Sequence, residues 1–197
     1  METFFTKRRY GMHTISPPLS QREKQIIIGT ILGGSSIVKP QRGKHCYLAM
    51  RAIHGEWLEY KAFQLSKFAS DKPFSIEKTN RWRSLCYPVF DEFRDMFYED
   101  GKRKLRLDVL EGLHDIALAM WFGDSGKYER ETATINTHIW GEAGSLTLIE
   151  YFKLIDYSAE IFLERKKFRV RLNKKSSKKL IELTSPHLPL FMTQKNI

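Results

Sequence analysis

Cationic side chains recur at alternate positions in several short segments of the chain. In "KFRVRL", Lys167, Arg169 and Arg171 alternate with apolar residues. An extended strand points successive side chains to opposite faces, so these three cations would share one face while the apolar residues share the other. Clustered ammonium and guanidinium groups neutralise phosphates. The spacing therefore predicts a strand that is packed on one side and binds a polyanion on the other.

Other segments repeat this alternation with polar or cationic residues. Acidic residues instead concentrate in predicted helices such as "GEWLEY" and "DEFRDMFYED". A merely solvated sheet face usually carries both signs of charge, so a nucleic-acid surface is the favoured interpretation. The candidate nucleic-acid-binding residues are Lys39, Arg42, Lys44, Tyr47, Arg51, Arg81, Arg83, Asn136, His138, Lys167, Arg169, Arg171, Lys174 and Lys175.

The overall composition agrees with a folded protein that binds a polyanion. Lys and Arg total 33 against 23 Asp and Glu, which gives a formal net charge of +10, and 42% of the residues are hydrophobic. Nucleic acid is the first partner that this charge suggests, before an anionic membrane surface. No apolar run approaches the roughly 20 residues that span a bilayer, and the first residues lack the apolar core of a secretory signal. No membrane partner is expected.

Cysteine and histidine give no support for a metal site. Cys46 and Cys86 form no CxxC pair, and the histidines follow no ligand spacing. We expect two reduced, packed thiols and no metal ligands from these residues.

The elements that would position the cations occur in the same order twice. The first series is a helix capped by Ser20 and Glu23, strands at 36–40 and 45–53, a helix at 55–68, strands at 74–78 and 80–86, and a helix at 88–100. The second is a helix at 108–123, strands at 126–130 and 132–138, a helix at 143–156, strands at 159–164 and 167–172, and a helix at 176–184. Such a repeat predicts two fused, pseudo-symmetric halves. The expected boundaries are an N-terminal extension 1–19, a first half 20–100, a linker 101–108, a second half 109–192 and a tail 193–197.

Two glycine-containing helix ends stand at equivalent places in the repeat. "IIIGTILGGSS" and "LAMWFGDSGKY" resemble the two motif helices of single-chain LAGLIDADG homing endonucleases, and phrases such as "EWLEYKAFQL" and "NRWRSLCYPVFDEF" lie in the expected order between them. The resemblance implies an α+β fold, a duplicated αββαββα unit in which two antiparallel sheets form a saddle. It also implies that the motif helices pack together through small residues such as Gly29.

The same resemblance implies metal-dependent cleavage of nucleic acid, but the two acidic residues that this reaction requires are missing. Family members place one acid at the foot of each motif helix, where the two acids hold divalent metal ions beside the scissile phosphates. Here those positions are Gly34 and Ser125, and Asp124 is the only remaining candidate. One residue along a helix turns a side chain by about 100°, so we expect Asp124 to point away from the shared site. No catalytic residue, metal ligand or cofactor is therefore predicted.

Three functions remain open at this point. The favoured one is a cleavage-inactive protein that binds structured RNA, either like an intron maturase or as part of an organellar ribonucleoprotein or ribosomal RNA assembly with further protein partners. The second is an active site-specific DNA endonuclease with Mg²⁺ at an atypical site on Asp124. The third is a non-cleaving DNA-binding regulator. Each would be a monomer with internal pseudo-two-fold symmetry, and the family suggests an organelle, the mitochondrion in particular.

Overall fold

A computed structural model describes residues 15–69, 72–76 and 79–193. Most of the expected N-terminal extension, residues 1–14, and most of the expected tail, residues 194–197, lie outside the described residues. Within them, no helix is long and apolar enough to cross a membrane.

The first series of elements forms as the sequence predicts. Its elements are α1 (Gln21–Leu32), β1 (Ser36–Val38), β2 (Tyr47–Ala52), α2 (Gly55–Gln64), η1 (Ser66–Phe68), β3 (Phe74–Ile76), β4 (Thr79–Arg83) and α3 (Val89–Phe97). The capping box at the start of α1 is present: the Glu23 backbone N–H donates to Ser20 Oγ, and the Ser20 N–H donates to the Glu23 carboxylate. The predicted helix at 55–68 is α-helical to Gln64 and ends as the 3₁₀ turn η1.

The second series follows the same plan with one break. Its elements are α4 (Leu107–Glu111), α5 (Asp115–Ser125), β7 (Gly126–Glu129), β8 (Thr132–Asn136), α6 (Gly141–Leu154), β9 (Ala159–Glu164), β10 (Lys167–Leu172), α7 (Lys174–Thr184), η2 (Ser185–His187) and α8 (Leu190–Thr193). The prediction of one continuous helix at 108–123 is wrong. The chain ends α4 at Gly112 and begins α5 after His114, whose backbone N–H donates to the buried Gln25 side chain.

The connection between the halves is more structured than a plain linker. A two-stranded hairpin, β5 (Tyr98–Glu99) with β6 (Lys102–Arg103), occupies the end of the predicted helix at 88–100 and the start of the predicted linker. The linker then runs directly into α4 at Leu107.

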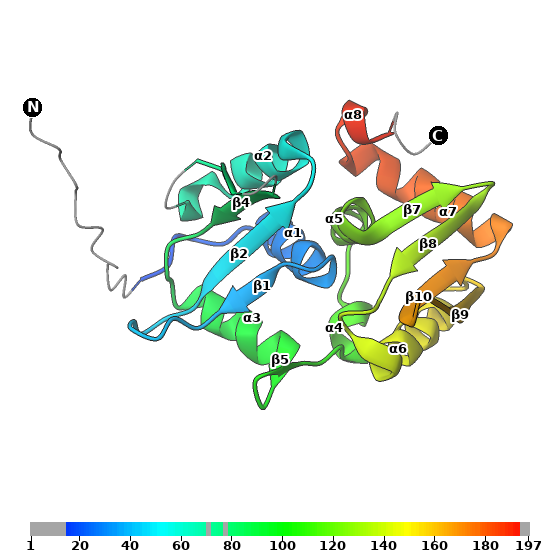
Figure 1. Ribbon diagram of the computed structural model, residues 1–197, viewed down its shortest axis with the longest axis horizontal. Coiled ribbons are helices and arrows are strands. Elements are labelled where there is room, and N and C mark those ends of the chain that lie inside the picture. Colours follow the sequence, from blue (N-terminus) through cyan, green and yellow to red (C-terminus); the bar gives the residue numbers. More distant parts are fainter. Residues whose placement is uncertain (1–14, 70–71, 77–78, 194–197) are drawn as a thin grey trace, which may run out of the picture.

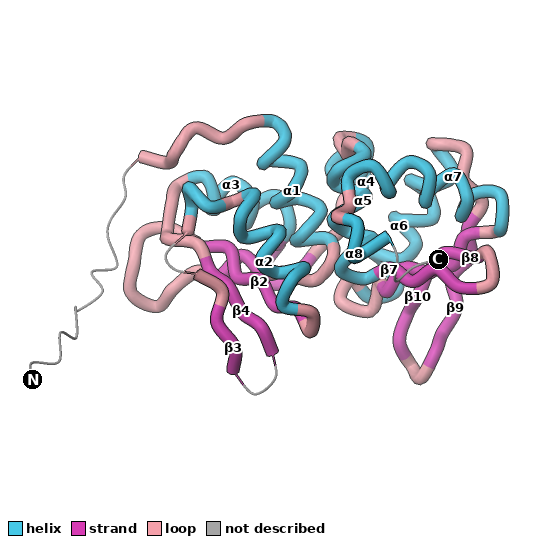
Figure 2. The backbone as a smooth tube through the Cα atoms, turned by 90° about the horizontal axis from the view of Figure 1, so that it is seen from above, coloured by secondary structure: helices cyan, strands magenta, loops and turns pink. Residues whose placement is uncertain are grey.

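Both halves build an antiparallel sheet with the same strand order, β1-β2-β4-β3 in one and β7-β8-β10-β9 in the other (Figure 1). The registers also correspond. Arg81 of β4 lies opposite Phe74, and Arg169 of β10 lies opposite Phe162. Equivalent positions in the two halves can therefore be compared directly. Seen from above, the helices lie on one side and both sheets on the other, with the β3–β4 and β9–β10 hairpins protruding (Figure 2). This is the predicted α+β saddle.

The halves meet where α1 packs against α5. A Cβ placed on Gly29 would lie 2.2 Å from the carbonyl oxygen of Ala117 and 2.8 Å from Met120 Cβ. These distances are too short for any side chain, so the helix backbones approach closely because residue 29 is glycine. Buried side chains of both helices, including Ile26 of α1 and Met120 of α5, belong to the same hydrophobic core.

Replacing Gly29 should destabilise the fold. We expect Gly29→Ala to lower the free energy of unfolding by about 1–3 kcal/mol, because the added methyl meets the backbone of the opposite helix. Gly112→Ala is the matched control, since the nearest atom to its new Cβ would lie at 3.7 Å. Urea denaturation measures both. Equal stability of the two variants would contradict the close approach.

Candidate nucleic-acid interface

The first sheet places its arginines together on the face away from the core. Trp82 of β4 is buried, so the alternation puts Arg81 and Arg83 on the opposite face. Arg51 of β2 lies directly opposite Arg81, and Ala49 lies opposite Arg83. Tyr47 belongs to this same face of β2. The four residues predicted from β2 and β4 are thus brought together.

The second sheet repeats the arrangement. Val170 of β10 is buried, while Arg169 and Arg171 occupy the other face. Arg169 lies opposite Asn136 of β8, and Arg171 lies opposite Thr134. Lys167 begins the same row of β10. The residues predicted from β8 and β10 therefore also form one surface.

The remaining predicted residues lie at the margins of these faces. Lys39, Arg42 and Lys44 are exposed in the connection between β1 and β2. Lys174 and Lys175 are exposed in the first turn of α7, and Lys174 donates to Glu131 at 2.6 Å.

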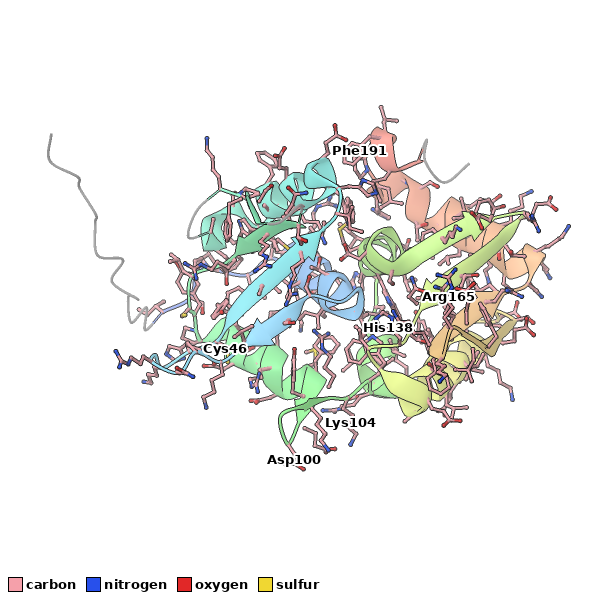
Figure 3. All side chains as sticks on the ribbon, viewed as in Figure 1. Cys46, Asp100, Lys104, His138, Arg165 and Phe191 are labelled. Carbon is pink, nitrogen blue, oxygen red and sulfur yellow. The ribbon has the colours of Figure 1, made fainter. Side chains whose placement is uncertain are left out.

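His138 follows β8 and lies beside the joint near the centre of the molecule (Figure 3). Partial burial lowers its pKa below the usual value, and the nearby charges of Lys167 and Arg169 lower it further. A neutral imidazole is a donor on one nitrogen and an acceptor on the other, which suits it to contact a polar ligand.

Acidic residues are not confined to helices in the second half, contrary to the sequence expectation. Glu129, Glu160 and Glu164 stand in the strands of the second sheet. Glu164 lies 2.5 Å from Arg169, and Glu160 lies 3.8 Å from Arg171. The two sheets therefore differ in charge.

The positions that the motif would fill with acids carry no carboxylate. Gly34 is exposed in the turn after α1 with a φ of 125°, a left-handed conformation that glycine adopts readily. The hydroxyl of Ser125 donates back to the Trp121 carbonyl at 3.0 Å within α5. Ser125 is the last residue of α5 and Gly34 lies just beyond the end of α1, and neither offers a charged ligand.

Asp124 lies in the joint rather than pointing away from it, so the expectation about its direction is wrong. It packs against Gly33, where an added Cβ would lie 2.3 Å from Asp124 Cβ. Its carboxylate accepts from Lys61 Nζ at 2.5 and 2.8 Å and from Trp57 Nε1 at 2.6 Å. The Lys61 side chain is completely buried and that of Asp124 is 8% exposed. The one remaining acid is thus held by a lysine of the other half.

Lys61 is a residue that the sequence interpretation missed. It stands four residues after Trp57 and three after Leu58, on the apolar side of α2. A lysine on an otherwise apolar side of a helix requires a buried partner of opposite charge. The position of Lys61 in the sequence therefore could have predicted a buried ion pair.

Arg103 is the second missed residue. Its guanidinium donates to the carbonyl oxygen of Ser35 at 2.7 Å and to Ser36 Oγ at 2.8 Å, and it reaches the Gly34 carbonyl at 3.3 Å. Burial lowers the pKa of the guanidinium from its usual value. Beside it, Trp140 Nε1 donates to the Leu32 carbonyl at 3.1 Å. The end of α1 is therefore held from the linker and from the second half.

A cleft of about 540 Å³ opens beside these residues, lined by Gly34, Asp124, Arg51 and His54 among others. Mg²⁺ prefers several oxygen ligands and is usually held by carboxylates. The cleft has a single carboxylate that is already bound to an ammonium group. Within the described part of the chain, no group of three or more His, Cys, Asp or Glu residues could hold a metal ion. The residues present do not fit the divalent ions that the motif implies.

The fold and this site define a single chain of two pseudo-symmetric α+β lobes, joined by two glycine-containing helices, with a polar sheet face on each lobe. A family model described as the LAGLIDADG DNA endonuclease family matches residues 24–180. The chain belongs to this family.

Comparison with known proteins gives relatives of the same kind. "Probable intron-encoded endonuclease 1" of Wickerhamomyces canadensis is 28% identical over 129 residues, which is 60% of this chain and 56% of that protein. The chain thus spans about half the length of this relative. The homing endonuclease I-WcaI bound to its DNA recognition sequence superimposes with a TM-score of 0.85 at 20% identity, covering 92% of this chain and 88% of that one. I-DmoI in complex with DNA and Ca gives a TM-score of 0.60 at 12% identity, covering 88% and 96%. These structural likenesses establish the fold.

The Lys61–Asp124 pair should respond differently to single and double replacement. Lys61→Met or Asp124→Leu alone should lower the free energy of unfolding by about 3–5 kcal/mol, because each leaves a buried charge without its partner. The double variant Lys61→Met/Asp124→Leu should recover most of that loss. Chemical denaturation measures all three. Additive losses in the double variant would show that the two side chains act independently.

Proposed function

We propose that this protein binds double-stranded DNA through both sheets and does not cleave it by the metal-dependent route of its family. The observation that carries the proposal is the absence of acids at two positions in the joint between the lobes. The two positions that should supply acids are Gly34 and Ser125, while the polar sheet faces on either side are intact.

The ligand proposed is duplex DNA in place of the structured RNA favoured from sequence. The family model names DNA endonucleases, and the I-WcaI and I-DmoI structures named above hold DNA. The major groove of B-DNA admits β-strands and displays a distinct pattern at each base pair. The major groove of RNA helices is too narrow for side chains to read. A protruding strand hairpin on each lobe suits the major groove of B-DNA.

The joint offers too few oxygen ligands to hold a catalytic metal ion. Asp124 alone provides one carboxylate, and Lys61 and Trp57 already donate three hydrogen bonds to it. A metal ion bound there would have to displace a buried ammonium group, which would then be left without a counter-charge. The same observation argues against the alternative of an endonuclease that works with Asp124 alone.

DNA binding should weaken steeply with salt. Each phosphate contact contributes about 0.9 to the slope of log affinity against log salt, so Arg51→Gln/Arg81→Gln should make the slope shallower by about 1.8 if each arginine contacts one phosphate. Fluorescence anisotropy with a labelled duplex measures the slope. Arg22→Gln/Lys178→Gln removes the same charge from exposed helical positions and should leave the slope nearly unchanged.

Two further outcomes bear on the proposal. Incubation of supercoiled plasmid with the protein and Mg²⁺ should leave the plasmid uncut. If the wild-type protein nicked the plasmid and Asp124→Asn abolished the nicking, the proposal of an inactive joint would be contradicted. Tighter binding to a structured RNA than to duplex DNA at equal salt would replace DNA with RNA as the ligand.

A further inference from the structure

The pseudo-symmetry of the two sheets exposes a difference in charge at equivalent positions. Phe74 opposite Arg81 corresponds to Phe162 opposite Arg169. Two residues before and two after these phenylalanines, the first half carries Lys72 and Ile76, whereas the second half carries Glu160 and Glu164. The edge strand of the second sheet is therefore acidic where the first is not.

The acids of the second sheet are paired with its own cations. Glu164 lies 2.5 Å from Arg169 Nη1, and Glu160 lies 3.8 Å from Arg171 Nη1, whose guanidinium also stacks over Phe162 at 4.2 Å from the ring centre. The guanidinium groups of Arg169 and Arg171 thus already have a carboxylate nearby.

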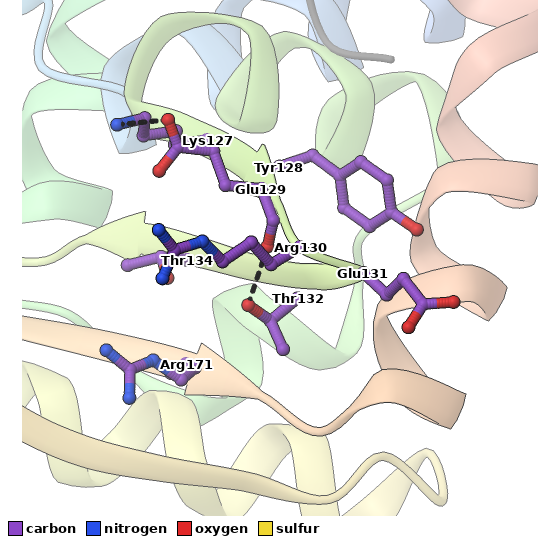
Figure 4. Close-up of a pocket in the computed structure, with 8 residues that line it drawn as sticks. All are labelled: Lys127, Tyr128, Glu129, Arg130, Glu131, Thr132, Thr134 and Arg171. Atoms are coloured by element: carbon purple, nitrogen blue, oxygen red, sulfur yellow. Dashed lines mark hydrogen bonds and ion pairs between the residues drawn. The ribbon is translucent and has the colours of Figure 1, made fainter.

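The neighbouring hairpin shows the same pairing. Lys127 lies 2.6 Å from Glu129 in the hollow between β7 and β10 that Arg130 and Arg171 also line (Figure 4). Ion pairs therefore occur on β7 as well as between β9 and β10.

The strands of the first sheet differ in this respect, as far as the structure describes them. Its four strands contain arginines but no Asp or Glu. Among the residues that the structure describes, Arg51 and Arg81 have no carboxylate oxygen within 4.0 Å. These guanidinium groups can meet phosphates without first leaving an internal partner.

We infer that the two lobes divide the work of DNA recognition, with Glu160 and Glu164 as specificity-determining residues. The first sheet supplies most of the sequence-independent attraction to phosphates. In the second sheet, the two carboxylates compete with phosphate for Arg169 and Arg171 and repel the DNA backbone. A duplex is accepted there only when contacts to its base edges compensate for that repulsion, which is a general route to specificity. This inference rests on the proposed function.

The test compares Glu160→Gln/Glu164→Gln with the wild-type protein on two duplexes. One duplex is selected by the wild-type protein from a random pool, and the other has a random sequence. Freeing two arginines for phosphates should steepen the salt slope on the random duplex by about 1.8, at about 0.9 per contact. Since this gain is independent of sequence, the ratio of affinities for selected and random duplex should fall.

A matched control separates a local effect from a change in net charge. Glu99→Gln/Glu182→Gln also removes two exposed carboxylates that pair with lysines, but from a linker hairpin and a helix. The reciprocal variant Lys72→Glu/Ile76→Glu should place carboxylates on the first sheet that compete with phosphates. It should therefore make the slope of log affinity against log salt shallower. Circular dichroism checks that each variant folds.

Three results would overturn the inference. The slope of Glu160→Gln/Glu164→Gln could be no steeper than that of the control. Alternatively, this variant could lose affinity for the selected duplex with an unchanged slope, which would show that the carboxylates contact bases directly. An absence of salt-dependent DNA binding by the wild-type protein would overturn the proposed function as well, so the two failures are distinguishable.

Discussion

The close packing of α1 against α5 is the constraint on which the rest of this structure depends. Gly29 lets one helix backbone rest on the carbonyl of Ala117 in the other. Each sheet is connected to one of these helices, α1 leading into β1 and α5 leading directly into β7. The relative orientation of the two sheet faces follows from a contact made of backbone atoms, which leaves little freedom for the lobes to shift.

The buried negative charge in the joint is neutralised by another side chain of the same protein. Burial of an isolated carboxylate is costly, so Asp124 requires a cation, and Lys61 together with Trp57 meets this need. The pair also links α2 of the first half to α5 of the second. The buried ion pair thereby contributes to holding the lobes together, while the sheets keep their own separate charge pattern.

Features encoded locally could be predicted from the sequence. The Ser20–Glu23 spacing fixed the start of α1, and the alternation in "KFRVRL" assigned both faces of β10. The same order of elements occurs twice, with "IIIGTILGGSS" and "LAMWFGDSGKY" at equivalent places, and this repeat predicted the two-lobed architecture.

Features that arise only from long-range contacts could not be predicted. Lys61 meets Asp124 across 63 positions, and Arg103 reaches Ser35 across 68. Neither pairing has a local signal, although a lysine on the apolar side of α2 was a hint. The break after α4 was missed because the apolar period continues through Gly112, while the decisive hydrogen bond comes from Gln25 on another helix. The charge balance of the second sheet was misjudged because the carboxylates stand on a different strand from the arginines that they neutralise.

The attachment of Arg103 and Trp140 to the end of α1 has a geometric consequence. The linker and the second lobe both hold the same turn of backbone, so these hydrogen bonds restrain the span between the two sheets. One extra base pair in a duplex rotates everything beyond it by about 34°, given about 10.5 base pairs per helical turn. If the protein binds duplex DNA as proposed, lobes held in this way would respond to the rotational phase of two half-sites as well as to their sequences. Two correct half-sites at the wrong spacing would then bind as a single half-site.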